Sequence, residues 1–272
     1  MPIKTLPQRT DDDMTDTILV ERDGTIVTVT LNRPEKLNAL SYEMYDKLGQ
    51  AFEAISADDS VRCVVVRGAG GRAFSAGADI GEFGTGRAGR EQAREYGEFS
   101  LRACAWVTDC PHPVLASITG VCVGGGFELA GRCDLRICGE SSRFGIPVNR
   151  LGLTVDYDEL KLLVDTIGYQ PVLEVLLEGR LFDAREALRM GLVGKVVPDD
   201  EVEEEVAATA RRIAAAAPLV NRWHKKFLRR LLDPRPLTDA ERDEAYLCFD
   251  TQDYRIGCAA FLEKRTPEFK GS

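Results

Sequence analysis

The chain has 272 residues, of which 44% are hydrophobic, and its 35 Lys and Arg against 44 Asp and Glu give a formal net charge of −9 at pH 7. This length and composition suit one large domain, or one domain with a helical appendage, and exclude a disordered tail protein. The negative charge repels a polyphosphate track, so we expect no nucleic acid partner.

The chain opens with a polar stretch and then a predicted β-hairpin. Residues 1–17 are polar and acidic and lack the basic-then-apolar order of a signal peptide, so we expect a loose tail, or a stretch upstream of a start at Met14. Two β-rich runs, residues 18–23 and 25–31, are joined by Asp23-Gly24, a pair that accepts the positive φ angles of a tight turn. The folded core is therefore predicted to begin with a hairpin.

Strands and helices alternate in the next part of the chain. Ser41 can cap a helix whose apolar residues recur at steps of three to four, namely Met44, Leu48, Phe52 and Ile55. Residues 63–66 are a short, continuously apolar run, which predicts a strand buried on both faces. The pattern repeats with strands predicted at residues 114–118 and 135–138, and a helix is predicted to open between them at residues 127–131. This alternation indicates an α/β core.

The later segments differ in character. Residues 81–95 are glycine-rich and charged and predict a mobile surface loop, whereas the chain from Tyr157 onward is typical of helices. A helix over residues 201–216 has an acidic first turn, and the sequence Thr238-Asp239-Ala240-Glu241 predicts a capping box. We therefore divide the chain into a flexible N-terminal tail, an α/β core and a helical C-terminal region that packs on the core or on a neighbouring subunit; the bounds are 1–17, 18–200 and 201–272.

The sequence predicts neither a metal site, nor disulfides, nor a membrane span. The eight cysteines include no CxxC pair, and the only histidines are His112 and His224. Three of the cysteines, Cys63, Cys122 and Cys138, lie in apolar strand-like runs, which favours free thiols in a reducing cytoplasm. The longest uncharged run, residues 110–127, carries two prolines and four glycines, so we expect no membrane partner.

The most informative stretch is the glycine-rich turn over residues 120–130. A strand leads into Gly124, Gly125 and Gly126 and then into a helix, whose first N–H groups lack internal partners and are not shielded by a Cβ atom. An anion or a polarised carbonyl oxygen can dock there, although a tight turn needs glycines for its geometry as well. Glu128 stands about one helical turn beyond Gly125, beside whatever those groups hold; alternatively, it only complements the helix dipole.

A second candidate segment, residues 73–80, follows a buried strand and a glycine-rich turn. Its sequence, AFSAGADI, is rich in small residues, which let a ligand approach the backbone closely. Taken alone, the segment would be interpreted as a loop.

Together these stretches resemble the enoyl-CoA hydratase/isomerase, or crotonase, superfamily. The resemblance runs from about Ile18 through nearly the whole chain and rests on several ordered motifs: LNRPEKLNALS at 31–41, AFSAGADI at 73–80, HPVLASITGVCVGGGFELAGRCDLRI at 112–137, FGIPVNRLGL at 144–153, AREALRMGLVGKVV at 184–197 and AFLEKRTPEFKG at 260–271. It implies a spiral of ββα turns with a C-terminal helical region. It also implies a homotrimer or a dimer of trimers that binds acyl-CoA thioesters.

The resemblance assigns roles to individual residues. Two backbone N–H groups polarise the thioester oxygen in this family, and they map to Ala78 and Gly125. Other residues are expected to bind the substrate and its CoA moiety, and these are Lys36, Leu37, Ala39, Ala76, Asp79, Ile80, Gly124, Val148, Phe261 and Lys264. Lys36 and Lys264 also have the simpler interpretation of solvated surface lysines. Coenzyme A enters as part of the substrate, and no separate cofactor or metal is expected.

The acids depart from the family pattern. Hydratases of the family carry two glutamates; Glu128 matches the first, but Val148 stands where the second belongs. Some branches of the superfamily place an aspartate eight residues further along, which here is Asp156. Asp156, Asp158 and Glu159 can also be an exposed acidic helix start. His112, interpreted as a possible surface residue, and His224 lie outside the family's catalytic motifs.

The function predicted from the sequence is that of an acyl-CoA thioester enzyme that hydrates or isomerises a double bond, with Glu128 and Asp156 as the candidate acids. Two alternatives stay open. One is an acyl-CoA or carbon–carbon bond hydrolase of the same superfamily, and the other is a catalytically silent acyl-CoA binder.

Overall fold

The computed structural model describes residues 16–82 and 89–272 and builds them around two β-sheets. The larger sheet contains six strands in the order β1 (Ile18–Asp23), β2 (Ile26–Leu31), β3 (Cys63–Gly68), β5 (Val114–Ile118), β7 (Leu135–Gly139) and β10 (Lys195–Val197). The smaller sheet contains β4 (Ala73–Ser75), β6 (Val121–Val123), β8 (Arg143–Gly145) and β9 (Phe182–Asp183). Among the described strands, the β1–β2 and β8–β9 pairs alone are antiparallel, which confirms the hairpin and makes both sheets mixed.

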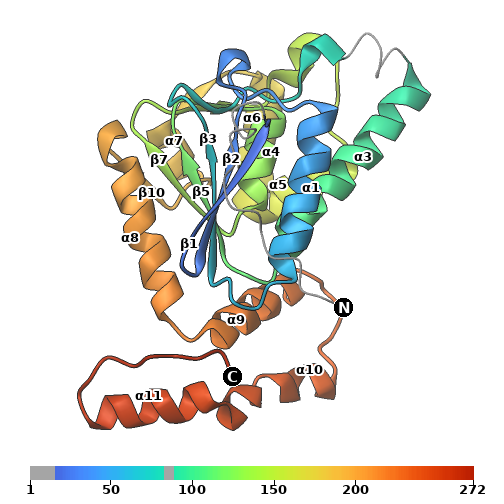
Figure 1. Cartoon of the computed structure of the whole chain (residues 1–272). Helices are drawn as coiled ribbons and strands as arrows, with labels where there is room; N and C mark the ends of the chain where they lie inside the picture. Colours follow the sequence, from blue (N-terminus) through green and yellow to red (C-terminus); the bar gives the residue numbers. More distant parts are fainter. Residues whose placement is uncertain (1–15, 83–88) are drawn as a thin grey trace.

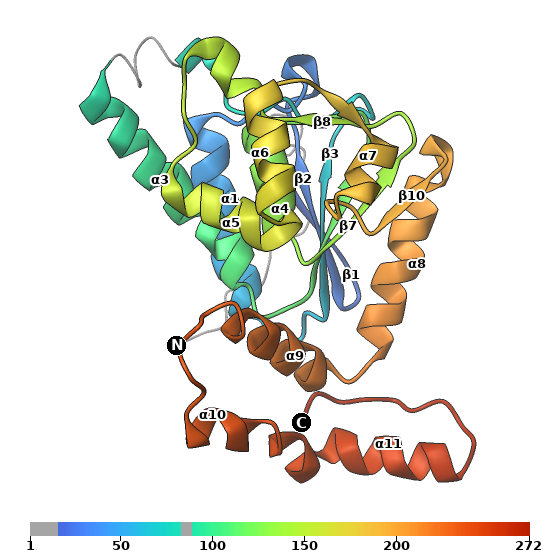
Figure 2. The ribbon, with the colours of Figure 1, turned by 180° about the vertical axis from the view of Figure 1, so that it is seen from behind.

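Helices cover both faces of the larger sheet. One face is covered by α8 (Val202–Ala215), and the other by a layer that includes α1 (Tyr42–Ser56), α3 (Arg90–Asp109) and α4 (Gly125–Arg132), as Figures 1 and 2 show from opposite sides. The short strands of the larger sheet lie between these layers: Val64 and Val66 of β3 are buried in the core on one face, and Cys63 and Val65 are buried in a second cluster on the other. Their continuously apolar sequence therefore reflects burial on both faces.

Local sequence signals explain where several helices begin. The Ser41 side chain accepts a hydrogen bond from the Met44 N–H and caps α1, whose four predicted core residues are all fully buried. The other α-helices in the described part of the chain are α5 (Tyr157–Ile167), α6 (Tyr169–Glu178), α7 (Ala184–Arg189), α9 (Pro218–Arg230), α10 (Asp239–Glu244) and α11 (Gln252–Leu262). No helix within residues 16–82 and 89–272 combines the length and apolar character that crossing a bilayer requires.

The loop predicted over residues 81–95 is wrong in part. Residues 80–82 form a short 3-10 helix, and α3 begins at Arg90, while residues 83–88 lie outside the described part of the chain. Arg94 pairs with Glu91 and Glu98 along the helix, and Tyr96 is buried beneath it. Pairs at these spacings support a helix, so the charged composition that suggested a loop belongs to an exposed helical face.

The interpretation of His112 as a surface residue is wrong. The imidazole is fully buried, and its Nε2 lies 3.0 Å from the backbone oxygen of Ile55. The Lys225 ammonium on α9 donates to the His112 backbone oxygen over 2.9 Å. A helix more than a hundred residues further along the chain therefore covers this position.

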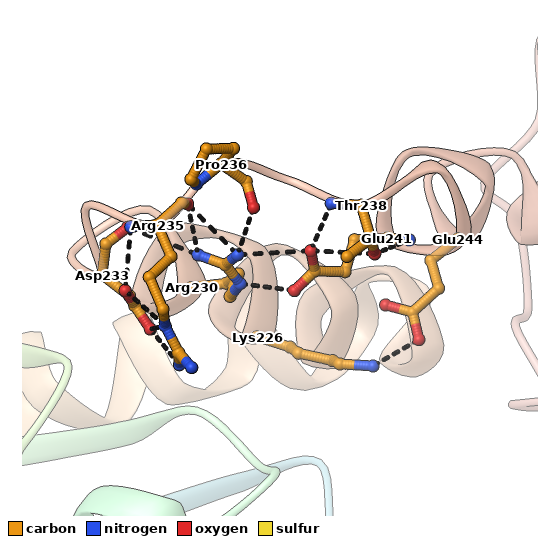
Figure 3. Close-up of polar contacts among 8 residues, drawn as sticks. All are labelled: Lys226, Arg230, Asp233, Arg235, Pro236, Thr238, Glu241 and Glu244. Carbon is orange, nitrogen blue, oxygen red and sulfur yellow. Dashed lines mark hydrogen bonds and ion pairs between the residues drawn. The ribbon is translucent and has the colours of Figure 1, made fainter.

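The C-terminal helices are joined by polar contacts. Figure 3 shows the Arg230 guanidinium at the end of α9 donating to the Glu241 carboxylate of α10 and to the backbone oxygens of Arg235 and Pro236. Glu241 also completes the predicted capping box with Thr238. These contacts fix the path of the chain from α9 to α10, which lies beside α11 at the lower end of the molecule in Figure 1.

Candidate active site

The site is built where two loops run side by side. The Leu40 N–H donates to the Gly77 backbone oxygen over 2.7 Å, and the Asp79 N–H donates back to Leu40 over 2.9 Å. The Ala76 N–H donates to the Leu37 backbone oxygen over 2.9 Å. This short parallel pairing holds Ala78 against the start of α1.

The two predicted amide donors lie close together. A Cβ atom placed on Gly125 would lie 3.5 Å from the Ala78 nitrogen, and one placed on Gly77 would lie 3.3 Å from the Gly125 nitrogen. Gly77 and Gly124 have φ angles of +94° and +50°, a region that side chains rarely allow, so glycine is needed at both positions.

Both amide groups are available to a ligand. Within residues 16–82 and 89–272 the Ala78 N–H has no hydrogen-bond acceptor, whereas the N–H groups of Gly77 and Asp79 on either side donate to Ser75 and Leu40. Gly125 is the first residue of α4, so its N–H has no partner inside the helix. Two adjacent, unpaired amides with no bulky side chain between them can bind one oxygen atom from two directions.

Two carboxyl groups meet beside these amides. Glu128, in the first turn of α4, is half-buried and shares a side-chain hydrogen bond with Glu159 on α5. Burial raises the pKa of Glu128 well above its usual value, and Glu159 raises it further by its charge and its hydrogen bond, while Arg132 acts in the opposite direction. The bond requires one of the two carboxyls to carry a proton, so the pair offers one acid and one base.

Asp156 caps the start of α5 and does not pair with Glu128. Its Oδ1 accepts a hydrogen bond from the Glu159 N–H over 2.9 Å and caps the first turn of α5, and the residue is exposed. Asp156 adds to the raised pKa of Glu128 through its charge alone, as the weakest of the causes. Val148 lies on a 3-10 helix and packs against the hydrophobic core, so no carboxyl group approaches Glu128 from the usual second position.

A buried tyrosine reaches the same place. Tyr45 of α1 is 4% exposed, and its Oη would lie 3.0 Å from a Cβ atom on Gly125. Its ring packs edge-on against Tyr96 of α3 with 6.1 Å between the ring centroids. Burial raises the pKa of Tyr45 well above its usual value, so the hydroxyl stays protonated.

The residues predicted to bind CoA fall into two groups. One group lies on the two paired loops and includes Lys36, which is exposed, and Ile80, which is 65% exposed; its other members are Leu37, Ala39, Ala76 and Asp79. Phe261 lies on α11 and Lys264 follows it, at the opposite end of the molecule from the turn of residues 34–36 (Figure 1). The structure of one chain therefore does not bring these two residues to the loops.

Asp79 is engaged in holding these loops. Its carboxylate accepts hydrogen bonds from the Arg33 guanidinium and from the Gly81 N–H, both over 2.9 Å. Although burial acts in the other direction, these two donors hold the pKa of Asp79 below its usual value. Arg33 also donates to the Ala39 backbone oxygen over 2.8 Å, so the pair ties the two predicted CoA-binding segments together.

Sequence reasoning missed Glu159 and Tyr45 as residues of the site. Glu159 was seen only as a member of an acidic helix start, although its place three residues after a capping aspartate does put it in the first turn of a helix. Tyr45 carried no signal, because it stands among the apolar positions of α1. As for metals, the described residues contain no group of three or more His, Cys, Asp or Glu side chains that could hold an ion.

Comparison with known proteins gives consistent matches over the whole fold. The family model described as Enoyl-CoA hydratase/isomerase matches residues 21–272. A probable enoyl-CoA hydratase of Rhizobium meliloti is 36% identical over 258 residues, which cover 94% of this chain and 98% of that protein. A crotonyl-CoA hydratase of Syntrophomonas wolfei is 33% identical over 254 residues, or 93% of this chain and 97% of that protein. The crystal structure of an enoyl-CoA hydratase/carnithine racemase from Magnetospirillum magneticum has a TM-score of 0.93 at 51% identity and covers 95% of this chain and 97% of that chain.

Proposed function

The chain belongs to the enoyl-CoA hydratase/isomerase family and acts on acyl-CoA thioesters, and we propose that it hydrates the double bond of an enoyl-CoA with Glu128 and Glu159 as its acid–base pair. One observation carries the proposal: Glu128, which is hydrogen-bonded to Glu159 of α5, stands on α4, the helix whose first amide, with that of Ala78, is open to an oxygen atom. The α/β crotonase fold predicted from the sequence is confirmed by the solved structures that match this chain.

The amides of Ala78 and Gly125 supply the electrostatic part. When water adds to the β-carbon of an enoyl thioester, negative charge develops on the thioester oxygen. Preorganised N–H donors aimed at that oxygen stabilise the charge without reorganisation, and one such donor contributes about 10²–10³ in rate. Because the donors belong to the backbone, their position depends on the loop glycines and not on a side-chain rotamer.

The two carboxyls supply the proton transfers. The ionised member takes a proton from a water molecule as its oxygen bonds to the β-carbon, and the protonated member delivers a proton to the α-carbon. Proton and charge balance, because the pair begins and ends with one proton between two carboxyls. Glu159 on α5 thereby supplies the second carboxyl group, which the valine at position 148 cannot supply.

The relatives support hydration over the alternatives. The proteins of Rhizobium meliloti and Syntrophomonas wolfei carry the names of hydratases, at 36% and 33% identity. A lone acid would support isomerisation or silent binding, but the Glu128–Glu159 pair restores the second carboxyl group on which hydration depends.

The remaining assignments follow from the same proposal. We propose that Lys36, Leu37, Ala39, Ala76, Asp79 and Ile80 hold the CoA moiety, with Gly124 and Val148 nearer the acyl group. Phe261 and Lys264 can reach a CoA site only on a neighbouring subunit, which fits a homotrimer or a dimer of trimers. The exposed apolar side chains of Tyr246, Phe249 and Phe261 give that assembly a surface to bury. All eight cysteines are free, six of them buried, which supports the cytoplasm as the location.

One experiment separates the candidate reactions. A panel of enoyl-CoA thioesters is incubated in deuterated water and followed by mass spectrometry, which reports addition of water, isotope exchange and release of CoA together. Hydration with loss of the activity in both Glu128→Gln and Glu159→Gln supports the proposal. Isotope exchange alone indicates an isomerase, free CoA indicates a hydrolase, and tight binding without any change indicates a silent binder.

A further inference from the structure

Arg132, the last residue of α4, carries a buried positive charge that has no ion-pair partner. The residue is 7% exposed. Within residues 16–82 and 89–272 its guanidinium donates one hydrogen bond, to the Thr108 Oγ1 of α3 over 3.3 Å, and forms no ion pair with a carboxylate. A buried cation is costly unless a negative group nearby balances it. The charges around α4 show which group that is.

The carboxylates of the adjoining pocket already have partners. Arg132 lines a pocket between α3, α4, α5 and α9, together with three aspartates. Each aspartate is paired with a cation of its own, and the pairs are Asp109 with Arg229 at 3.8 Å, Asp134 with Lys225 at 2.7 Å, and Asp165 with Lys161. Arg136 lines the same pocket, donates to backbone oxygens and adds a further positive charge. The pocket therefore has no surplus negative charge to offer Arg132.

The remaining negative charge near Arg132 is that of the acid pair. Glu128 stands four residues before Arg132 on α4, a spacing that places two side chains on one face of a helix with about 5–6 Å between their Cβ atoms. Glu159 comes from α5, which packs against α4, and shares a proton with Glu128. Arg132 lowers the pKa of Glu128, against burial and the charge of Glu159, which raise it. The pair thus carries the one negative charge that can balance Arg132.

We propose that Arg132 is a positioning residue that balances the single negative charge of the Glu128–Glu159 pair and so keeps one of the two carboxyls ionised while the enzyme works. This inference rests on the proposed function, in which the ionised carboxyl takes a proton from water. Without Arg132 the pair would bind a second proton more readily, and a pair with two protons contains no base. Arg132 acts on the reaction only through the pair.

The other groups that face Glu128 do not replace this cation. Cys104 of α3 and Tyr45 of α1 lose their protons only at alkaline pH, because burial raises the pKa of Cys104 to about 12 and that of Tyr45 well above its usual value. Asp156 of α5 brings a further negative charge, which raises the pKa of Glu128. A guanidinium stays charged in proteins, so Arg132 opposes these influences over the whole working range of pH.

The test is Arg132→Met, which removes the charge and keeps a long, unbranched side chain. Arg132→Lys retains the charge, and Arg229→Met is the matched control, because it removes a cation from the same pocket that is already paired with Asp109. Loss of the Arg132 charge makes both protons of the pair harder to remove. The pH at which kcat/KM rises and the pH at which it falls should therefore both move upward in Arg132→Met, by about one pH unit. Arg132→Lys and Arg229→Met should keep the wild-type profile.

A direct titration separates this role from a structural one. NMR of ¹³C-labelled glutamate reports the pKa of Glu128, which should rise in Arg132→Met and stay at the wild-type value in Arg132→Lys. A residue needed only for packing would lower kcat or the midpoint of thermal unfolding and leave that pKa in place. Arg132→Gln, which keeps an N–H donor for Thr108, is the second variant if Arg132→Met does not fold by circular dichroism.

The outcomes separate the two proposals. If the pKa of Glu128 and the pH profile of a folded, uncharged variant equal those of the wild type, Arg132 does not balance the pair, and the proposed function stands on the loss of hydration in Glu128→Gln. An equal displacement in Arg229→Met would also overturn the assignment, since any cation of the pocket would then act alike. If the pKa rises in Arg132→Met but the wild type hydrates no enoyl-CoA of the panel, the proposed function fails, whereas the charge balance holds.

Discussion

Glu159, and not Asp156, shares a hydrogen bond with Glu128, although Asp156 stands only three residues earlier in the chain. The difference follows from the start of α5. Asp156 turns its carboxylate onto the first turn of the helix as a cap, and Glu159, one turn further, faces α4. In the proposed function, the second acid therefore comes from a helix face and not from the loop after the proline.

The first prediction tests this pairing by substitution. Glu159→Gln and Glu128→Gln should each lower kcat for hydration about 10²- to 10⁴-fold, because each removes one of the two proton-transfer groups. Asp156→Asn should stay within a few-fold, since asparagine caps a helix as well as aspartate does. Asp158→Asn, on the same exposed turn, is the control. Loss of activity in Asp156→Asn with full activity in Glu159→Gln would reverse the assignment.

The second prediction concerns the pKa of the pair. Burial, the charge of Glu159 and the hydrogen bond between the two carboxyls together raise the pKa of Glu128 well above its usual value. Glu159→Gln removes the charge, so the pKa of Glu128 should fall but stay raised because burial remains. Titration of ¹³C-labelled glutamate by NMR measures both values. In the wild type, kcat/KM should decrease at alkaline pH, at the pH where the pair loses its shared proton. A flat profile up to pH 9, together with an ordinary pKa for Glu128, would contradict the proposal that Glu128 and Glu159 share a proton.

The structure also shows which features the sequence could predict. Strands such as β3 and caps such as Ser41 were predicted correctly, because burial on two faces and side-chain capping are visible in neighbouring residues. The start of α3 was missed, because glycines before Arg90 conceal a helix that ion pairs support. His112 was misplaced for a different reason: α9, which covers it, comes from far along the chain.

The second acid could not be predicted from spacing alone. Asp156, Asp158 and Glu159 fall in one helical turn, and the sequence does not tell which of them faces α4. That choice depends on how α5 packs against α4, a tertiary relationship that local patterns do not encode. The closeness of the Ala78 and Gly125 amides, which we propose as donors, was easier to predict, because both residues lie in motifs whose glycines fix the backbone.

The third prediction links the site to stability. Glu128 has a raised pKa in the folded chain and an ordinary one when unfolded, so its contribution to stability is complete below pH of about 4.5 and is lost as the pH rises through the folded value. Glu128→Gln does not ionise and should raise the midpoint of thermal unfolding at pH 7, with no gain at pH 4. Glu53→Gln, on the exposed face of α1, is the control. Equal midpoints of Glu128→Gln and wild type at both pH values would show that burial imposes no cost.

The fourth prediction isolates the Gly125 donor. Proline removes the N–H and is tolerated at the first position of a helix, where that N–H has no partner inside the helix. Gly125→Pro should lower kcat about 10²- to 10³-fold. Gly125→Ala is the matched control, because its Cβ meets the Tyr45 hydroxyl in the same way, at 3.0 Å, but it keeps the N–H. If kcat falls equally in Gly125→Pro and Gly125→Ala, the loss of activity comes from crowding at Tyr45 and not from the missing N–H.

The fifth prediction concerns His112. Burial, followed by the charges of Arg222 and Lys225, lowers the pKa of His112 to about 4, with Asp59 and the Ile55 carbonyl acting in the opposite direction. The unfolded chain takes up this proton near pH 6.5 and the folded chain only near pH 4, so stability falls as the pH drops through that window.

Between pH 7 and pH 5 this linkage amounts to about 2 kcal/mol of the free energy of unfolding, since one pKa unit corresponds to about 1.4 kcal/mol. His112→Gln does not titrate, so urea unfolding of this variant should show a pH dependence smaller by that amount than the wild type. The carboxylates that also titrate toward acid pH are the same in both proteins and cancel in the comparison. His224→Gln, at an exposed position of α9, should keep the wild-type dependence. If His112→Gln loses as much stability as the wild type on going from pH 7 to pH 5, then His112 is protonated in the folded chain, and α9 does not shield it as its burial indicates.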